Sequence, residues 1–192
     1  MQLLKDRIRK EGKVLPGNII KVDGFLNHRV DTRLMGEIAD EFAKYFDVEN
    51  ITMVLTAEAS GIALATICAE RYNVPMVFAK KAKSDNIEGG LYQSEIFSYT
   101  YKKKVTQILS KEWLTASDRV LIVDDFMANG EAVRGLTDLV SQAGAELVGI
   151  GVAIEKGFQG GGDRLRDMGL NYHALAVIES ADENGIVFRD DE

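Results

Sequence analysis

The sequence is poor in the residues from which disulfide and metal frameworks are built. Among its 192 residues it has one cysteine, Cys68, and two histidines, His28 and His173. A single cysteine cannot form an internal disulfide, and its apolar surroundings favour a role as a small core residue. The two histidines are far apart in the sequence and have no metal-ligand spacing, so a zinc site is not expected.

Long apolar runs and positive charge are also scarce. No segment approaches the ~20 apolar residues that a membrane-spanning helix needs, and the charged N-terminus MQLLKDRIRKEGK has no secretory apolar core. We therefore expect a cytoplasmic protein with no membrane partner. The formal net charge of −7 disfavours a nucleic-acid partner, because such proteins usually present a basic face. The length suits a single domain, residues 1–192, that can bury a core without the support of a disulfide or a metal.

Buried strands alternate with amphipathic helices along the chain. The three- and four-residue spacing of Leu34, Ile38, Phe42 and Tyr45 predicts a helix over 31–46, with Asp31 as its N-cap. Continuous apolar runs predict buried strands, each followed by a loop; they lie at 51–56, 75–80, 120–125, 147–155 and 173–180. This alternation predicts an α/β fold with a doubly wound, mainly parallel sheet, which binds ligands beyond the carboxyl ends of its strands.

The stretch VLIVDDFMANGEA, residues 120–132, carries the strongest chemical signal. Asp124 and Asp125 end a buried strand, where carboxylates can accept hydrogen bonds from sugar hydroxyls or hold Mg²⁺ through water. The loop of small residues that follows opens a helix, so its backbone N–H groups form an anion site that a phosphate can approach closely. The pattern predicts a ribose 5-phosphate site. For the two aspartates alone, a solvated turn is the alternative.

Three other strand exits carry candidate groups. Ser60 and Gly61 in EASGI can present backbone N–H groups to a second anion, or form a plain strand-to-helix turn with Ser60 as N-cap. Lys80 and Lys81 end the next strand and can neutralise a polyanion, unless they form a solvated basic turn. Lys156 follows the fourth strand, where a cation suits an oxygen-rich planar ligand. A surface lysine is the alternative there.

The motifs resemble those of a known family. VLIVDDFMANGEA resembles the phosphoribosyl-pyrophosphate (PRPP) signature of type I phosphoribosyltransferases, and DGFLNHRVD, EASGI, VFAKK and GIGVAIEKGFQ are similar to the bacterial xanthine branch of that family. The resemblance spans essentially the whole chain. It implies the type I fold and transfer of the 5-phosphoribosyl group from PRPP to xanthine, which gives xanthosine 5′-monophosphate and pyrophosphate in purine salvage. It also implies Mg²⁺ as cofactor and a homodimer.

The resemblance assigns roles to individual residues. Asp124 and Asp125 are implied to be catalytic, with Mg²⁺ carried by PRPP and reached by these carboxylates only through water. The implied PRPP-binding residues are Ser60, Gly61, Lys80, Lys81, Ala128, Asn129, Gly130, Glu131 and Ala132. The implied xanthine-binding residues are Ile20, Asn27 and Lys156. Without the resemblance, Asn27 would be a turn residue and Ile20 a core residue.

The resemblance also implies two movable parts. A flexible hood, about residues 82–104, would close over the site, and Ser98 and Tyr99 would either anchor it or belong to an ordinary hairpin. A small lid would combine residues of about 14–30 with the C-terminal segment. Phe158 would either stack on the purine or pack in the core.

Two departures from the family pattern and two rival functions remain open. The phosphate loop has Asn129-Gly130 where many members have threonine-glycine, and Glu131 stands where the xanthine branch usually has glutamine. A carboxylate beside a phosphate is unfavourable unless it points away or is neutralised. One rival is a PRPP-sensing DNA-binding regulator, which would normally need an added domain. The other is an enzyme acting on hypoxanthine and guanine, or on adenine.

Overall fold

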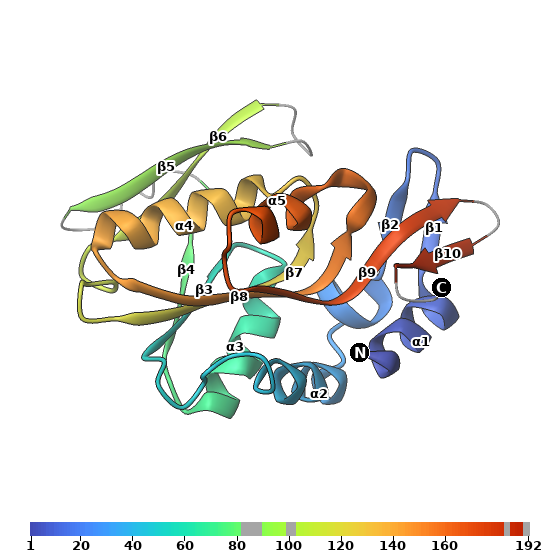
Figure 1. Cartoon of the computed structure of the whole chain (residues 1–192), viewed down its shortest axis with the longest axis horizontal. Helices are drawn as coiled ribbons and strands as arrows, with labels where there is room; N and C mark the ends of the chain where they lie inside the picture. Colours follow the sequence, from blue (N-terminus) through green and yellow to red (C-terminus); the bar gives the residue numbers. More distant parts are fainter. Residues whose placement is uncertain (82–89, 99–102, 183–184, 190–192) are drawn as a thin grey trace.

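A six-stranded sheet forms the centre of the protein (Figure 1). The structure is a computed structural model and describes residues 1–81, 90–98, 103–182 and 185–189. The strand order is β10–β9–β8–β7–β3–β4. All neighbours are parallel except β10, which is antiparallel to β9 at one edge. The strands are β3 Met53–Ala57, β4 Met76–Ala79, β7 Arg119–Met127, β8 Glu146–Lys156, β9 Tyr172–Asp182 and β10 Gly185–Phe188. The predicted mainly parallel α/β sheet is therefore confirmed.

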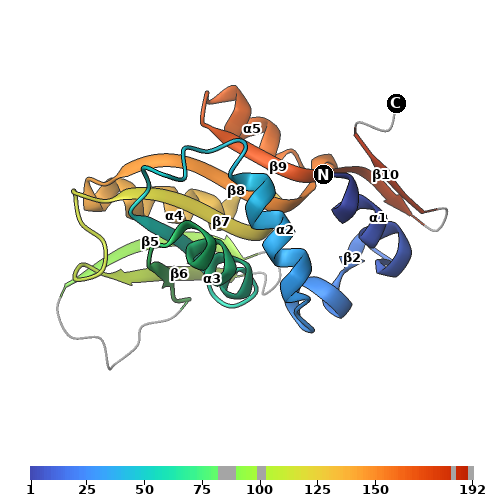
Figure 2. The ribbon, with the colours of Figure 1, turned by 90° about the horizontal axis from the view of Figure 1, so that it is seen from below.

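Helices cover both faces of the sheet. Figures 1 and 2 show α2, Thr32–Phe42, and α3, Gly61–Tyr72, on one face, with α4, Glu131–Ala143, and α5, Gly161–Asp167, on the other. Each face has its own apolar cluster. Covering both faces explains why β7 is a continuous apolar run rather than an alternating one, since its side chains are buried in both directions.

The sheet has a topological switch between β3 and β7. From β3 the chain passes through α3 to β4 on one side, whereas β7 leads to β8 and β9 on the other side. Neighbouring parallel strands whose connections run to opposite sides leave a crevice at their carboxyl ends. The loops that leave β3 and β7 therefore meet at this crevice.

Two smaller parts lie outside the sheet. The first is the N-terminal part, whose helix α1 and strand β1 contact β9 (Figure 1). It consists of α1, Gln2–Glu11, the short strand pair β1, Lys13–Leu15, and β2, Ile19–Lys21, and the single π-helical turn η1, Asp23–Asn27. An antiparallel hairpin of β5, Leu91–Ser98, and β6, Lys103–Ser110, lies over α4. Of the predicted hood, residues 82–89 and 99–102, with Tyr99, fall outside the described residues.

Most predicted elements are present, with two informative differences. Asp31 accepts a hydrogen bond from the Leu34 N–H at 3.1 Å, as an N-cap should. The helix that it begins ends at Phe42 rather than at residue 46, and Tyr45 is 44% exposed and stacks on His173. Strand β7 continues past the aspartates to Met127, because its pairing with β8 extends that far.

Candidate active site

Asp125 joins three distant segments at the crevice. Its Oδ1 accepts a hydrogen bond from the Ser60 hydroxyl at 2.9 Å, and its Oδ2 accepts one from the Asn27 side-chain amide at 2.9 Å. The carboxylate is buried, with 4% of the residue exposed. Ser60 makes no side-chain N-cap bond to α3, so its hydroxyl serves the carboxylate instead of the helix. The loop after β3 and the turn η1 are thereby fixed to the end of β7.

Asp124 lies beside it and is also buried. Its Oδ1 accepts the backbone N–H of Asp125 at 2.9 Å. Burial, followed by the charge of Asp125, raises the pKa of Asp124 well above its usual value, while the charge of Lys81 opposes the rise. A Cβ added to Gly61 would overlap Thr56 Oγ1 and come within 2.5 Å of Asp124 Oδ1. Glycine is therefore the residue that lets α3 begin against the two carboxylates.

The loop between β7 and α4 surrounds a small cavity of about 170 Å³. Gly130 has φ +84°, a left-handed conformation that favours glycine. It immediately precedes the N-terminus of α4, where free backbone N–H groups favour an anion. The cavity is lined by Lys81, Ile96, Phe97, Val105 and residues 126–133. The predicted phosphate loop thus borders a cavity that also contains a lysine.

Glu131 has its charge compensated on the hairpin side of the loop. Its Oε2 accepts the backbone N–H of Phe97 at 3.0 Å and pairs with Arg134 at 3.1 Å. The hydrogen bond from Arg134, followed by that from the Phe97 N–H, lowers the pKa of Glu131. The sequence raised the question whether this carboxylate is neutralised, and the structure pairs it with an arginine.

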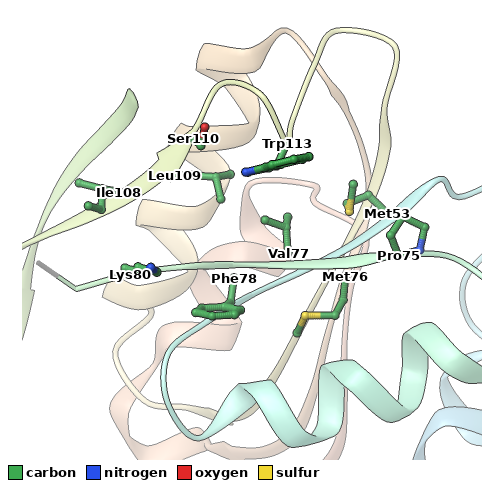
Figure 3. A pocket seen from close by; sticks show the side chains of 10 residues that line it. All are labelled: Met53, Pro75, Met76, Val77, Phe78, Lys80, Ile108, Leu109, Ser110 and Trp113. Atoms are coloured by element: carbon green, nitrogen blue, oxygen red, sulfur yellow. The ribbon is translucent and has the colours of Figure 1, made fainter. Parts of the chain in front are cut away.

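The two predicted lysines that follow β4 line different cavities. Lys81 lines the cavity at the phosphate loop, and its backbone N–H donates to Glu58 Oε1 at 2.6 Å. Lys80 forms an antiparallel backbone bridge with Ile108 and lines a different, mostly apolar cavity of about 450 Å³ between β4 and β6, next to Trp113 (Figure 3). The structure therefore brings Lys81 to the carboxylates and places Lys80 at the edge of the sheet.

The candidates for binding a base come from the end of β8 and from the N-terminal segment. Lys156 ends β8 and lies over the Phe126 ring, 5.6 Å from its centroid, and burial lowers its pKa. Asn27 reaches Asp125, as described above. Ile20 is 6% exposed and belongs to the apolar cluster, whereas Phe158 is 36% exposed and so is not a core residue. The assigned binding roles of Ile20, Asn27 and Lys156 stay predictions.

Three residues that the sequence analysis did not single out lie at the phosphate loop, at the hairpin or beside the start of α3. Arg164 of α5 donates to the Asn129 carbonyl at 2.6 Å, and Arg134 donates to the Glu95 carbonyl at 2.8 Å. Thr56 Oγ1 is buried and has no hydrogen-bond partner among the described residues. No sequence signal identifies Arg164, whereas the three-residue spacing of Glu131 and Arg134 on one helix could have indicated their ion pair.

Comparison with known proteins decides the family. Residues 28–180 match the phosphoribosyl transferase domain, and this range contains the carboxylate pair, the phosphate loop and the two lysines that follow β4. The chain belongs to the phosphoribosyltransferase family. Because the match leaves out both ends, the prediction of one domain over residues 1–192 stays a prediction.

Full-length relatives narrow the family. The chain is 55% identical to a xanthine phosphoribosyltransferase of Lachnoclostridium phytofermentans, with all of both chains covered. It is 49% identical to a protein of the same name from Alkaliphilus metalliredigens, with 100% of this chain and 95% of the relative covered. The resemblance to the xanthine branch is therefore confirmed.

Solved structures share the fold. The adenine phosphoribosyltransferase of Giardia lamblia, solved with 9-deazaadenine, aligns with TM-score 0.77 at 23% identity and covers 92% of this chain and 98% of its own. The adenine phosphoribosyltransferase of Trypanosoma brucei, solved with AMP, pyrophosphate and ribose-5-phosphate, aligns with TM-score 0.74 at 22% identity and covers 95% of this chain and 83% of its own. At this identity the likeness establishes the type I fold alone.

The described residues contain neither a membrane-spanning helix nor a cluster of metal ligands. None of their helices is long and apolar enough to cross a membrane. In the same part of the chain, no group of three or more His, Cys, Asp or Glu residues could hold a metal ion.

Proposed function

We propose that this protein transfers the 5-phosphoribosyl group from PRPP to xanthine, giving xanthosine 5′-monophosphate and pyrophosphate. The observation that carries the proposal is the match over the full chain to relatives named xanthine phosphoribosyltransferase. The geometry agrees with it, since a buried carboxylate pair lies near the end of β7, the loop that follows it borders a cavity, and Lys156 lies at the end of the neighbouring strand β8. A noncatalytic regulator is disfavoured, because the family domain fills most of the chain.

PRPP would be held by groups at the loops that follow β3, β4 and β7. The backbone N–H groups of residues 128–132, at the start of α4, would bind the 5′-phosphate. Asp124 and Asp125 would accept hydrogen bonds from the ribose hydroxyls. The backbone N–H groups of Ser60 and Gly61, together with Lys81, would face the pyrophosphate. Lys80, which lines the cavity at the sheet edge, is the least well placed of the predicted PRPP ligands.

The reaction would need positioning and charge rather than a covalent enzyme intermediate. The bond between C1 of the ribose and the pyrophosphate oxygen breaks, and its electron pair leaves with pyrophosphate. The sugar passes through an oxocarbenium-like state. A ring nitrogen of xanthine then donates an electron pair to C1 of the ribose, which forms the new bond, and the nitrogen loses its proton to water. The buried Asp125 carboxylate would stabilise the developing positive charge, and such preorganised electrostatics is often the largest catalytic contribution. Holding both substrates together supplies much of the rest.

Xanthine would be recognised by Lys156 and Asn27. A half-buried lysine is a strong donor to the oxygens of an oxopurine, because little water competes for it. The Asn27 amide donates to Asp125, which leaves its carbonyl oxygen to accept from a base N–H. Ile20, whose side chain is buried, could contribute through its backbone.

The carboxylates fit a cation that the substrate carries. Two adjacent aspartates are too few to hold Mg²⁺ alone, and both oxygens of Asp125 already accept hydrogen bonds. Mg²⁺ prefers a site completed by waters and substrate phosphates, so it would bind through PRPP and neutralise the leaving pyrophosphate. We also propose a homodimer, on the resemblance alone, which sedimentation analysis of the purified protein would test.

A substrate panel tests the proposal most directly. The purified protein would be incubated with PRPP, Mg²⁺ and, separately, xanthine, guanine, hypoxanthine and adenine, and the nucleotide formed would be quantified. We expect kcat/KM to be highest for xanthine. A higher value for any other base would replace xanthine as the substrate, and no nucleotide from any base would remove the enzymatic assignment. Gel mobility of DNA with and without PRPP would then test the regulator.

A further inference from the structure

The loop that would bind the 5′-phosphate is supported from behind by α5. A Cβ added to Gly161, the first residue of α5, would overlap the Ala128 carbonyl oxygen and come 2.9 Å from the Gly130 nitrogen. The residues that line the cavity come from the loop, from Lys81, from the hairpin and from the ends of β7 and α4, and α5 contributes none of them. The loop therefore separates α5 from the cavity.

Arg164 holds one peptide of this loop by its carbonyl. Its guanidinium Nη2 donates to the Asn129 carbonyl oxygen at 2.6 Å. In a planar trans peptide the C=O and the following N–H point in opposite directions. Because Arg164 draws the Asn129 carbonyl toward α5, the N–H of Gly130 is turned the other way.

This peptide would otherwise be free to rotate. Gly130, on its C-terminal side, is in the left-handed conformation and tolerates a wide range of backbone angles. A rotated peptide would direct a carbonyl oxygen, rather than an N–H donor, toward a phosphate. A carbonyl oxygen repels an anion, so the site needs a group that favours one orientation of the peptide.

The helix that carries Arg164 is itself firmly attached. Glu155 of β8 is fully buried and accepts hydrogen bonds from Arg166 and from the Tyr172 hydroxyl, and Arg189 pairs with Asp163 at the start of α5. Arg166 thus serves the attachment of α5, whereas Arg164 is the arginine directed at the loop.

We propose that Arg164 is a positioning residue for the 5′-phosphate: by holding the Asn129 carbonyl it keeps the Gly130 N–H directed at the phosphate. The proposal rests on the proposed function, which places the 5′-phosphate at this loop. It predicts a loss confined to ligands that carry a 5′-phosphate, since among the described residues the hydrogen bond of Arg164 goes to the phosphate loop and not to the loop after β3, which would bind pyrophosphate.

The test compares Arg164→Ala with the wild type by titration calorimetry. Hydrogen bonds to charged groups support a roughly tenfold rise in the Kd of ribose 5-phosphate, equal to about 1.4 kcal/mol. The Kd of pyrophosphate with Mg²⁺ should stay within about twofold. Arg33→Ala, which removes an exposed arginine of α2, is the matched control and should change neither value.

Two measurements separate positioning from other causes. Thermal melting should show the two variants within a few degrees of the wild type. Repeating the titrations at high salt should preserve the effect, because screening removes long-range attraction between charges but not a hydrogen-bonded peptide orientation. Weaker pyrophosphate binding, an effect lost at high salt, or an unchanged Kd for ribose 5-phosphate would each overturn the proposal. If the wild type bound neither ligand, the proposed function would fail instead.

Discussion

The Glu131 carboxylate accepts a hydrogen bond from the backbone N–H of Phe97 at 3.0 Å, so the first residue of α4 holds strand β5 of the hairpin. Farther along α4, Arg134 donates to the Glu95 carbonyl, and the Gln142 amide both donates to and accepts from the backbone of Gln93. These backbone groups alternate along the open edge of β5. Side chains of α4 thus satisfy an edge strand that would otherwise be exposed, and they connect the hairpin to the helix that follows the phosphate loop.

Because Arg134 neutralises Glu131, we expect Glu131→Gln to restore the KM for PRPP that Arg134→Ala impairs. Arg134→Ala should raise the KM for PRPP about threefold or more, because it leaves an uncompensated carboxylate beside the phosphate loop. Glu131→Gln alone should change this KM little, since an amide oxygen can still accept from the Phe97 N–H. The double variant should return close to the wild-type KM in steady-state kinetics. If it stayed as impaired as Arg134→Ala, the arginine would act on something other than this carboxylate.

Asp125→Asn should impair turnover far more than stability. The amide keeps an acceptor for the Ser60 hydroxyl, and the Asn27 amide can turn to accept from the new N–H₂ group, so the contacts at Asp125 survive. What is lost is the negative charge beside the developing cation, a change that typically costs about 100-fold in kcat. Steady-state rates and thermal melting on one preparation would check this. An unchanged kcat would leave the carboxylate without a catalytic role.

Asp124→Asn should stabilise the protein in a way that depends on pH. Because burial raises the pKa of Asp124 above its ordinary 3.8, the folded state binds this proton more tightly than the unfolded state does. The wild type therefore loses stability as pH rises from about 3.8 to the raised pKa, and the neutral asparagine does not. We expect the difference in Tm to grow with pH, by about 2–4 °C for each kcal/mol of charge burial. A Tm difference that is constant from acid to neutral pH would contradict the assignment.

Lys156→Ala should weaken the base site selectively. Removing a half-buried donor to the oxygens of the base should raise the KM for xanthine roughly tenfold or more. The Kd of PRPP, measured by calorimetry, should stay within about twofold. Lys10→Ala, at the exposed end of α1, is the control and should leave both constants unchanged. Loss of PRPP binding would move Lys156 from the base site to the phosphate side.

Local pattern was sufficient for the elements but not for their ends. Apolar runs predicted the buried strands because strands that are buried on both faces are mostly apolar. The end of β7 was predicted at Asp125, yet it extends to Met127, since the pairing partner β8 decides where a strand stops. The helix predicted to reach residue 46 ends at Phe42, and Tyr45 turns to stack on His173, a residue from a distant strand.

The candidate site shows the same division. Asp124, Asp125 and the loop that follows them are neighbours in the sequence, so the motif alone predicted that they act together. Asn27 and Ser60 reach Asp125 from 98 and 65 residues away in the sequence. The resemblance placed both residues in the site, but only the structure shows that they contact Asp125. Lys80 and Lys81 are adjacent, but Lys80 pairs with Ile108 of the hairpin, and the two lysines line different cavities.

By itself, the sequence determined the alternating buried strands, the acidic strand end and the small-residue loop before a helix, because these depend on composition and spacing within a few residues. The tertiary structure alone decided that Glu131 accepts the Phe97 N–H, that Arg164 holds the Asn129 carbonyl, and that Lys81 rather than Lys80 lines the cavity at the phosphate loop. The physical reason is that a hydrogen bond or an ion pair needs two groups within about 3 Å of each other. Which distant polar residues come that close is set by how the helices pack on the sheet.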